Sequence, residues 1–443
     1  MRRLGPGGQG VGAREASAGD VREACARLRA AGPELIRRST DDIAGVLGVV
    51  GVRFLDSDDP LRREALERLP HESGLSPRMA SEVLEGMASD WSAERLRRML
   101  RAEFGDPRCL DRPTELNGRR LMAHGPGLCV QIVSGSVPGV GVHALLRSLL
   151  VKAPTLIKPG RGDELLTELF AQGLGEVDSG LAGALAVLRW RGGSEAIERE
   201  AMTAADVAIV YGSDATVGAL RAMAPATTRV VGYHHRTGVA LVGRDSEPDR
   251  AASDLARSVA FFDQRGCVCP HRTWVETGGP LDAMDFAARV AQAMAHLESS
   301  LPAAPLSPEE ASALQQLRGT AELRAGASGG RVWHGGAAAP WTVIFEPDPV
   351  PGPTTLARGV RVHALQDLEV AGEALAPLGE HLQTVGYAGF GARLDRLMEI
   401  AGRSGASRVV PLRAMSFPPP WWLHDGRGPL LELVRWVEVE AER

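Results

Sequence analysis

Residues 128–159 read LCVQIVSGSVPGVGVHALLRSLLVKAPTLIKP. A short apolar run opens this stretch, a turn rich in Gly and Pro follows it, and apolar residues then recur at helical spacing. The stretch closes on a second apolar run, TLIKP. A strand, a helix and a second strand in this order form the unit from which parallel sheets are built. The stretch therefore predicts an α/β fold.

The alternation of strand and helix patterns continues beyond this stretch. Strands are expected at 185–190, 206–212, 228–233 and 272–278, and helices at 162–174, 193–202, 214–223 and 253–264. Apolar residues at helical spacing also run through residues 20–104, which predicts a helical N-terminal region. The Pro-, Gly- and Ala-rich residues 299–355 predict short helix mixed with long loops, and 430–439 alternates like a strand.

Composition and charge argue against several classes of protein, among them nucleic-acid-binding, membrane-spanning and disulfide-rich secreted proteins. The formal net charge of -5 leaves no basic footprint, so nucleic acid is not expected as a partner. The chain has no apolar run long enough to span a membrane and no signal-peptide pattern at its start, and its five cysteines do not form a disulfide framework. We therefore expect a cytoplasmic protein.

The segment FFDQRGCVCPHRTWVE, residues 261–276, carries the chemistry. Cys267 follows a predicted helix, lies in a Gly-containing turn and precedes a predicted strand. At such a position backbone N–H groups can stabilise a thiolate and an oxyanion, which favours a nucleophile. Cys267 could instead be a buried structural cysteine. Cys269 competes for the role of nucleophile, but Pro270 directly after it indicates that Cys269 faces the core.

A metal site is the other reading of this segment. Cys267, Cys269 and His271 lie close in sequence, and His234 and His235 could approach them. Structural zinc sites usually have wider ligand spacing. We therefore predict no metal.

The cysteine segment resembles the nucleophile segment of the acyl-CoA reductase family, LuxC type, within the aldehyde dehydrogenase superfamily. Further similar stretches follow in the right order, and the resemblance covers about residues 100–440: VSGSVPGVGVHALLRSLLVKAPTLIKP, DVAIVYGSDATVG and SRVVPLRAMSFPPPWWLHDGRGPLLELVRWV. It implies a Rossmann-like parallel-sheet cofactor domain plus an α/β catalytic domain. The implied reaction is NAD(P)H-dependent reduction of a fatty acyl thioester to the aldehyde through an acyl group on Cys267.

The resemblance divides the chain into five regions. We expect a disordered tail, a helical region, a nucleotide-binding domain, a catalytic domain and a segment returning to the cofactor domain or an interface, at 1–18, 19–104, 105–255, 256–415 and 416–443. The tail holds GPGGQGVG, which resembles a phosphate loop, but no strand precedes it, and a flexible tail is the better reading.

The resemblance also implies cofactor contacts. Lys158, at the end of TLIKP, corresponds to a lysine that contacts the adenosine ribose. Arg161 stands where NAD-using relatives often have Glu, and an arginine pairs with a 2′-phosphate, so NADPH is favoured over NADH. A last group of residues is expected near the cofactor phosphates or nicotinamide, although any strand-to-helix turn uses such residues: Gly212, Ser213 and Gly218.

Two departures from the pattern of oxidising aldehyde dehydrogenases bear on the reaction, and the second of them points to reduction. Ser136 stands where oxidising relatives have the Asn that donates to the oxyanion, so the Cys267 backbone N–H carries more of that role. The glutamate that activates water for hydrolysis is also missing, and Tyr233, His234 and His235 occupy its place. An enzyme that reduces its acyl group needs no such base. His235 or His234 could protonate the leaving thiolate, and a surface or core role is the alternative.

Three other functions remain open from sequence. The protein could oxidise aldehydes to the acid or to acyl-CoA, it could be a catalytically weakened partner subunit, or it could be a dehydrogenase that acts on a semialdehyde phosphate or an amino-acid intermediate. For the preferred reading the donor is fatty acyl-CoA or an acyl carrier. We expect a homo-oligomer, with an acyl-transferring partner as a further possibility.

Overall fold

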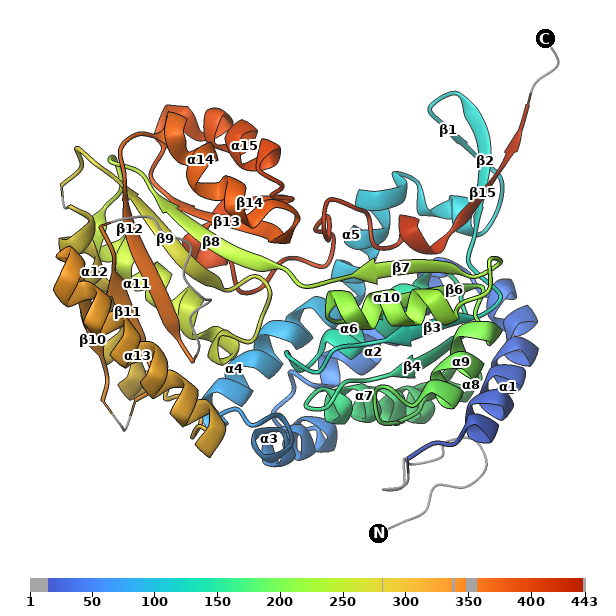
Figure 1. Ribbon diagram of the computed structural model, residues 1–443. Helices are drawn as coiled ribbons and strands as arrows, with labels where there is room; N and C mark the ends of the chain where they lie inside the picture. The colour runs from blue at the N-terminus through green and yellow to red at the C-terminus, as the bar shows by residue number, and fades with distance from the viewer. Residues whose placement is uncertain (1–14, 281, 337–338, 348–356, 441–443) are drawn as a thin grey trace. The chain divides into compact units, whose positions relative to one another are not determined.

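The computed structural model describes residues 15–280, 282–336, 339–347 and 357–440. It divides into two compact units, each described here by itself (Figure 1). The first unit lies within Met1–Gly74, Ser81–His234 and Pro419–Arg443, and the second within Leu75–Ala80 and His235–Pro418. In the described part of the chain, no helix is long and apolar enough to cross a membrane.

The helical N-terminal region is confirmed, with five helices: α1 (Ala18–Arg37), α2 (Thr40–Arg53), α3 (Pro60–Ser73), α4 (Pro77–Ala88) and α5 (Ala93–Phe104). The expected disorder is wrong for residues 15–18, because Ser17 and Asp20 form a capping box at the start of α1 and the Ala16 N–H donates to the Arg189 carbonyl at 2.7 Å. Residues 1–14 lie outside the described part of the chain.

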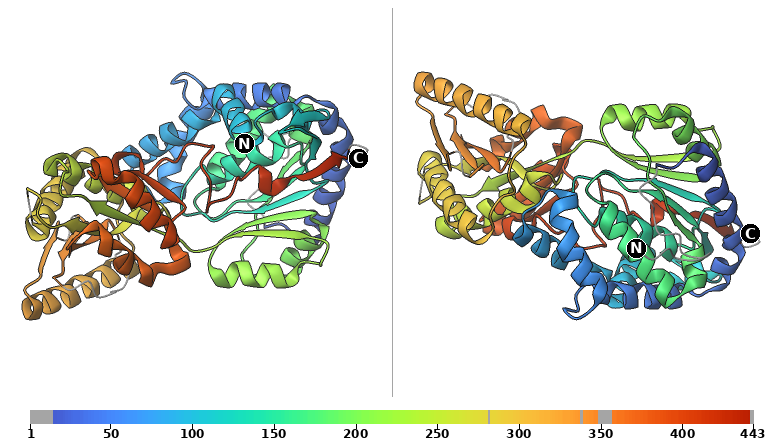
Figure 2. Two further views of the ribbon diagram at one scale, coloured as in Figure 1. Left: turned by 90° about the horizontal axis from the view of Figure 1, so that it is seen from above. Right: turned by 90° about the horizontal axis from the view of Figure 1, so that it is seen from below.

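A five-stranded parallel sheet in the order β5-β4-β3-β6-β7 forms the centre of the first unit. Its strands are β3 (Cys129–Ile132), β4 (Thr155–Lys158), β5 (Leu185–Val187), β6 (Val207–Tyr211) and β7 (Arg229–Tyr233). Helices cover both faces (Figure 2). On one face lie α1, α9 (Glu195–Ala204) and α10 (Asp214–Met223), and on the other α6 (Val140–Leu150) and α7 (Glu164–Val177). The predicted α/β fold is confirmed.

The end of the chain belongs to a small antiparallel sheet in the first unit. Its order is β1 (Thr114–Leu116), β2 (Arg119–His124) and β15 (Arg435–Val439). Arg119 and Glu438 form an ion pair across β2 and β15. The predicted C-terminal strand is confirmed for its second half, whereas residues 431–433 form a 3-10 turn.

A seven-stranded sheet forms the centre of the second unit. Its order is β10 (Arg331–His334), β11 (Thr342–Phe345), β12 (Gly359–Leu365), β9 (Pro270–Glu276), β8 (Thr237–Val242), β13 (Leu382–Ala388) and β14 (Arg408–Pro411). All neighbours pair in parallel except β10 and β11. One face carries α11 (Pro248–Ala260) and α12 (Ala283–Ser300), and the other α14 (Ala371–Leu375) and α15 (Leu394–Arg403).

Three details differ from the sequence-based expectations. The boundary between the units falls after His234 rather than near residue 255, because β8 pairs with β9 and β13. The region 299–355 contains the 21-residue α13 (Pro308–Ser328), which Ser307 and Glu310 cap, rather than only short helix. Helix α11 ends at Ala260, before the expected 264. Residues 337–338 and 348–356 lie outside the described part.

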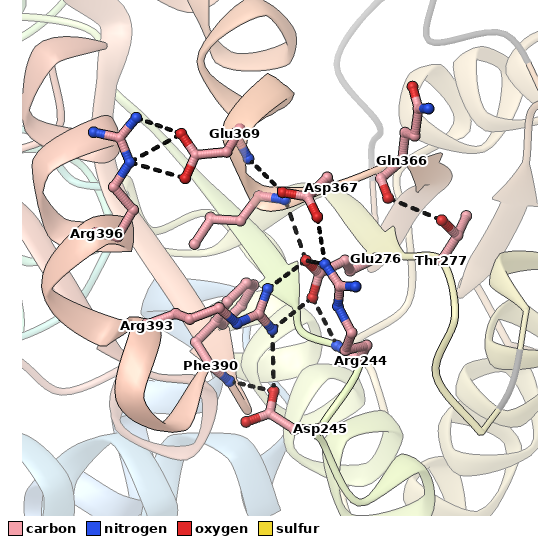
Figure 3. A network of polar contacts seen from close by, with 11 residues as sticks. Arg244, Asp245, Glu276, Thr277, Gln366, Asp367, Glu369, Phe390, Arg393 and Arg396 are labelled. Carbon is pink, nitrogen blue, oxygen red and sulfur yellow. Dashed lines mark hydrogen bonds and ion pairs between the residues drawn. The ribbon is translucent and has the colours of Figure 1, made fainter.

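A buried carboxylate anchors the far end of β9. The side chain of Glu276, 0% exposed, accepts from the Arg244 side chain at 2.8 Å and from the Arg393 side chain at 2.5 and 2.8 Å (Figure 3). The N–H groups of Arg244 and Leu368 donate to the same carboxylate. Burial alone would raise the pKa of Glu276, but the two guanidinium groups outweigh it and lower the pKa to about 2. This network joins four segments of the second unit around the last residue of β9.

Candidate active site

The first group of predicted site residues lies at the carboxyl edge of the five-stranded sheet. Ser136 follows β3, Lys158 ends β4, and Arg161 lies in the turn after β4. Gly212 and Ser213 follow β6. Strand order reverses direction between β3 and β6, and parallel α/β sheets bind ligands in the crevice at such a reversal. Five of the predicted residues therefore share one sheet edge.

Two glycines let the turns after β3 and β4 pack backbone against backbone. A Cβ on Gly135 would lie 1.8 Å from the Arg161 carbonyl oxygen, and one on Gly160 would lie 2.1 Å from the Gly135 nitrogen. Neither position has room for a side chain. This close approach holds Ser136 and Arg161 on adjoining turns, with both residues exposed.

The N-terminus of α6, which follows the turn that contains Ser136, is occupied by the side chain of Asp163. Both carboxylate oxygens of Asp163 accept hydrogen bonds at 2.5 Å, from the Gly139 N–H and the Gly141 N–H. Burial raises the pKa of Asp163 to about 8, and these two N–H groups act against that rise. Because Asp163 occupies the N-terminus of α6, this helix end is not available to a phosphate.

The two predicted cofactor cations differ in environment. Lys158 is half-buried, and burial lowers its pKa while the carboxylates of Glu198 and Glu164 act in the opposite direction. Arg161 is exposed, and its side chain has no hydrogen bond or ion pair with any residue that the structure describes. A cation of this kind can bind an external anion without first breaking an internal ion pair.

The turn after β6 begins α10. Ser213 caps this helix by accepting from the Thr216 N–H at 3.2 Å, and a Cβ on Gly212 would meet the Thr216 side chain at 3.1 Å. Gly218 lies inside α10, exposed, and a Cβ there would meet nothing within 4 Å. The structure therefore offers a local reason for glycine at 212 and none at 218.

The ends of β6 and β7 carry an aromatic stack that the sequence did not predict. Tyr211 and Tyr233 stack at 4.8 Å between ring centroids, Tyr233 and His424 at 4.2 Å, and His424 and Trp422 at 4.6 Å. The Arg427 guanidinium lies 4.9 Å from the Tyr233 ring centroid. The C-terminal segment thus packs against the ends of β6 and β7, and the ring of Tyr233 lies between those of Tyr211 and His424.

The second group of predicted residues lies at the amino edge of the seven-stranded sheet. Cys267 precedes β9, His235 precedes the neighbouring β8, and Arg408 begins β14 at the same edge. His235 is exposed, and its carbonyl oxygen accepts from Nδ1 of His381 at 3.1 Å. A Cβ on Gly238 would lie 2.6 Å from the Val268 carbonyl oxygen, so the start of β8 packs closely against the cysteine segment.

The two cysteines of this segment face opposite environments. Cys267 is exposed in the turn before β9, whereas Cys269 is buried and its thiol donates to the Phe261 carbonyl at 3.5 Å. Burial raises the pKa of Cys269 to about 12, which disfavours its thiolate. The geometry therefore favours Cys267 as the nucleophile, and Cys269 holds the turn to the core.

The backbone before Cys267 is strained. Phe262, Asp263 and Gln264 have φ values of 57°, 49° and 63°, so three consecutive non-glycine residues are left-handed. This conformation costs roughly 1–2 kcal/mol per residue for an L-amino acid. Such strain persists only where surrounding contacts impose the conformation, and it is concentrated at functional sites. The left-handed turn replaces the helix that the sequence predicted here.

Arg408 is the cation of this edge. Its guanidinium donates to the carbonyl oxygens of Met415 at 2.8 Å and Ala414 at 2.6 Å. Burial lowers the pKa of Arg408 to about 10, and the negative charge of the Cys267 thiolate acts in the opposite direction. A cation that interacts with a cysteine stabilises its thiolate form over the thiol.

Arg408→Gln is therefore expected to slow alkylation of Cys267 by iodoacetamide at pH 7 about tenfold, because the thiolate loses its cationic neighbour. The measurement is the alkylation rate as a function of pH. At high pH, where the thiol is fully ionised, the variant and the wild type should converge. A rate that stays tenfold lower at high pH would show that Arg408 acts by shaping the turn, not through its charge.

Comparison with known proteins shows the family and the fold of the chain. Residues 35–436 match the family described as acyl-CoA reductase (LuxC). The chain belongs to the LuxC acyl-CoA reductase family. A relative within it, a long-chain acyl-protein thioester reductase from Aliivibrio fischeri, is 23% identical over 416 residues, which cover 91% of this chain and 83% of the relative.

The fold of this chain is that of solved aldehyde dehydrogenase structures. Succinate-semialdehyde dehydrogenase from Burkholderia pseudomallei matches with a TM-score of 0.74 and 17% identity, covering 98% of this chain and 92% of that one. A mutant aldehyde dehydrogenase from Pseudomonas syringae, complexed with NAD+ and octanal, matches with a TM-score of 0.72, 17% identity and the same coverages. The predicted family and fold are both confirmed.

Several residues of the site could not be predicted from the sequence, because the residues that they contact are distant in the chain. Arg408 and Asp163 carry no motif of their own in the sequence. The paired glycines 135 and 160 offered a weak signal, since each follows a predicted strand closely. Their packing against each other required the sheet order.

Proposed function

We propose that this family member reduces a fatty acyl thioester to the aldehyde through an acyl group carried on Cys267, with a nicotinamide cofactor as the reductant. The observation that carries the proposal is the exposure of Cys267 in a strained, anchored turn. The other four cysteines are buried. Acyl-CoA and an acyl-protein are both proposed donors, the second because the Aliivibrio fischeri relative is named for that substrate.

The reaction begins with attack of the Cys267 thiolate on the thioester carbonyl. A new carbon–sulfur bond forms, the bond to the leaving thiolate breaks, and the acyl group remains on Cys267 as an activated thioester. A bound nicotinamide cofactor would supply the hydride that reduces this acyl group. Breaking the carbon–sulfur bond then releases the aldehyde and restores the Cys267 thiolate. Backbone N–H groups of the turn are the proposed donors to the carbonyl oxygen.

The residues of the first unit fit such a cofactor. The carboxyl edge of its parallel sheet carries the half-buried Lys158, Arg161, whose side chain makes no ion pair with a described residue, and the Gly212–Ser213 turn. The strand order of the sheet reverses at this edge. The tight backbone packing at Gly135 and Gly160 leaves this edge free of side chains at two positions. We propose that Lys158 and Arg161 bind the ribose and its phosphate. Among the proposed cofactor-binding residues, Gly218 has the least structural support. His235 is a candidate proton donor to the leaving group.

The proposed function is tested by incubating the protein with a long-chain acyl-CoA and NADPH. We expect NADPH absorbance to fall in step with the formation of aldehyde. Mass spectrometry without NADPH should show one acyl group on the peptide that contains Cys267. Oxidation of an aldehyde to free acid without CoA, with no reduction of acyl-CoA, would contradict the proposal.

Arg161→Ala is expected to raise the KM for NADPH at least about tenfold while leaving the KM for NADH within about threefold. A charge-assisted hydrogen bond contributes roughly 1.5–3 kcal/mol, and about 1.4 kcal/mol corresponds to a tenfold change. The measurement is steady-state kinetics with both cofactors. Arg191, a second exposed arginine of the first unit, provides a control, since Arg191→Ala should leave both KM values unchanged. An equal loss with NADH would mean that Arg161 does not bind the 2′-phosphate.

A further inference from the structure

The turn that carries Cys267 is closed by the side-chain amide of Gln264. Nε2 of Gln264 donates to the carbonyl oxygen of Pro270 at 2.9 Å, so the amide spans the segment in which Cys267 lies. The same amide pairs with both backbone groups of Gly359, the first residue of β12: it donates to the carbonyl oxygen and accepts from the N–H at 2.8 Å. Gln264 is itself buried. It therefore ties the nucleophile turn to the starts of two adjacent strands.

Asp263 is fixed by a buried cation. Its Oδ1 accepts a hydrogen bond from Nε of Arg358 at 2.9 Å, and Nη2 of the same guanidinium lies 2.7 Å from Oδ1 as an ion pair. The Arg358 side chain is 2% exposed and also donates to Glu298 at 3.1 Å and to the Leu301 carbonyl at 2.8 Å. Because Arg358 has partners on both sides, it holds Asp263 against the end of α12.

These contacts maintain a backbone that would otherwise relax. Phe262, Asp263 and Gln264 are all left-handed, and without the contacts each would favour the right-handed or extended regions. A change of φ at any of the three would redirect the chain that leads into Cys267. The position of the thiol thus depends on side chains that do not touch a substrate.

We propose that Gln264 and Asp263 are positioning residues, which hold Cys267 at the tip of the turn for attack on the thioester. The proposal rests on the proposed function, in which Cys267 carries the acyl group. Displacing a reacting group by about 1 Å can cost roughly 100-fold in rate. The arrangement also separates the roles of the segment, because Gln264 and Cys269 are buried anchors and Cys267 is exposed.

Gln264→Glu tests the proposal, because it keeps the shape of the side chain but replaces the donor with an oxygen that faces two carbonyl oxygens. We expect acylation of Cys267 by acyl-CoA, followed by quenched-flow mass spectrometry, to slow on the order of 100-fold. Alkylation by iodoacetamide should slow about tenfold, and the KM for NADPH should stay unchanged. Asp263→Asn, which keeps the shape and tolerates a left-handed φ, should slow acylation about tenfold.

Gln131→Glu is the matched control. Gln131 lies on β3 in the first unit, is 2% exposed, and donates to the Ala144 carbonyl at 3.0 Å and the Ser148 hydroxyl at 2.6 Å. Gln131→Glu places the same new carboxyl group at another buried position. It should therefore lower the urea midpoint about as much as Gln264→Glu does, without changing the rate at which Cys267 is alkylated.

Two outcomes distinguish failure of the positioning role of Gln264 and Asp263 from failure of the proposed function. Unchanged alkylation and acylation rates in Gln264→Glu, or in Asp263→Asn if the first variant does not fold, would overturn the positioning role. If wild-type Cys267 takes up no acyl group yet alkylation still slows in Gln264→Glu, the proposed function fails while the positioning of the thiol is supported.

Discussion

Cys267→Ala is expected to abolish acyl transfer from acyl-CoA to the protein and to lower the reductase rate on the order of 10⁴-fold or more, because the reaction loses its nucleophile. All five cysteines lie in the described residues, and Cys267 alone is exposed. The remaining thiols are buried and cannot substitute for it. The measurements are mass spectrometry of the protein after incubation with acyl-CoA, and NADPH oxidation in the presence of the same substrate.

Cys269→Ala is the matched control. Its thiol donates to the Phe261 carbonyl in the core, so the alanine should lower stability by about 1–2 kcal/mol and leave acyl labelling of Cys267 intact. Labelling that survives Cys267→Ala and disappears in Cys269→Ala would move the nucleophile to Cys269. That result would also require the buried thiol to become accessible in solution.

Glu276→Gln is expected to lower the free energy of unfolding at pH 7 by about 2–4 kcal/mol. The carboxylate is fully buried, and the guanidinium groups of Arg244 and Arg393 and two backbone N–H groups converge on it. A neutral amide removes the charge that balances both arginines and places an NH2 group opposite these donors. The arginines are about one-third exposed, so water recovers part of the loss.

The pH dependence of this contribution has a defined sign. The folded-state pKa of Glu276 is lowered to about 2, from an ordinary value of 4.5. The stabilisation is therefore complete above pH 4.5 and is lost as the pH falls from 4.5 towards 2. Urea unfolding of wild type should lose this contribution in that window. The curve of Glu276→Gln should be flatter there, and the two proteins should converge near pH 2.

Glu369→Gln provides a control from the same network (Figure 3). Glu369 pairs with Arg396 at the surface, where both side chains are exposed and water screens the charges, so its loss should leave the urea midpoint nearly unchanged. Equal destabilisation by the two variants at pH 7 would contradict the importance of burial at Glu276.

The sequence alone predicted those features that depend on local pattern. The alternation of strands and helices from residue 128 onwards was sufficient for the parallel sheet of the first unit, because apolar periodicity is set by the burial of each element. Cys267 was identifiable because a Gly-containing turn before a strand is a local feature. The neighbouring Pro270 correctly indicated that Cys269 is buried.

Tertiary structure decided the features whose partners lie far apart in the chain. Gln264 and Gly359 are 95 positions apart, and their hydrogen bonds convert an expected helical end into a left-handed turn, against local preference. The unit boundary after His234 likewise follows from the pairing of β8 with β9 and β13. Local pattern therefore singled out Cys267 as the proposed nucleophile, whereas long-range contacts determined how the turn before it is held. The physical reason is that periodicity reports which side of an element is buried, but not which distant group it meets.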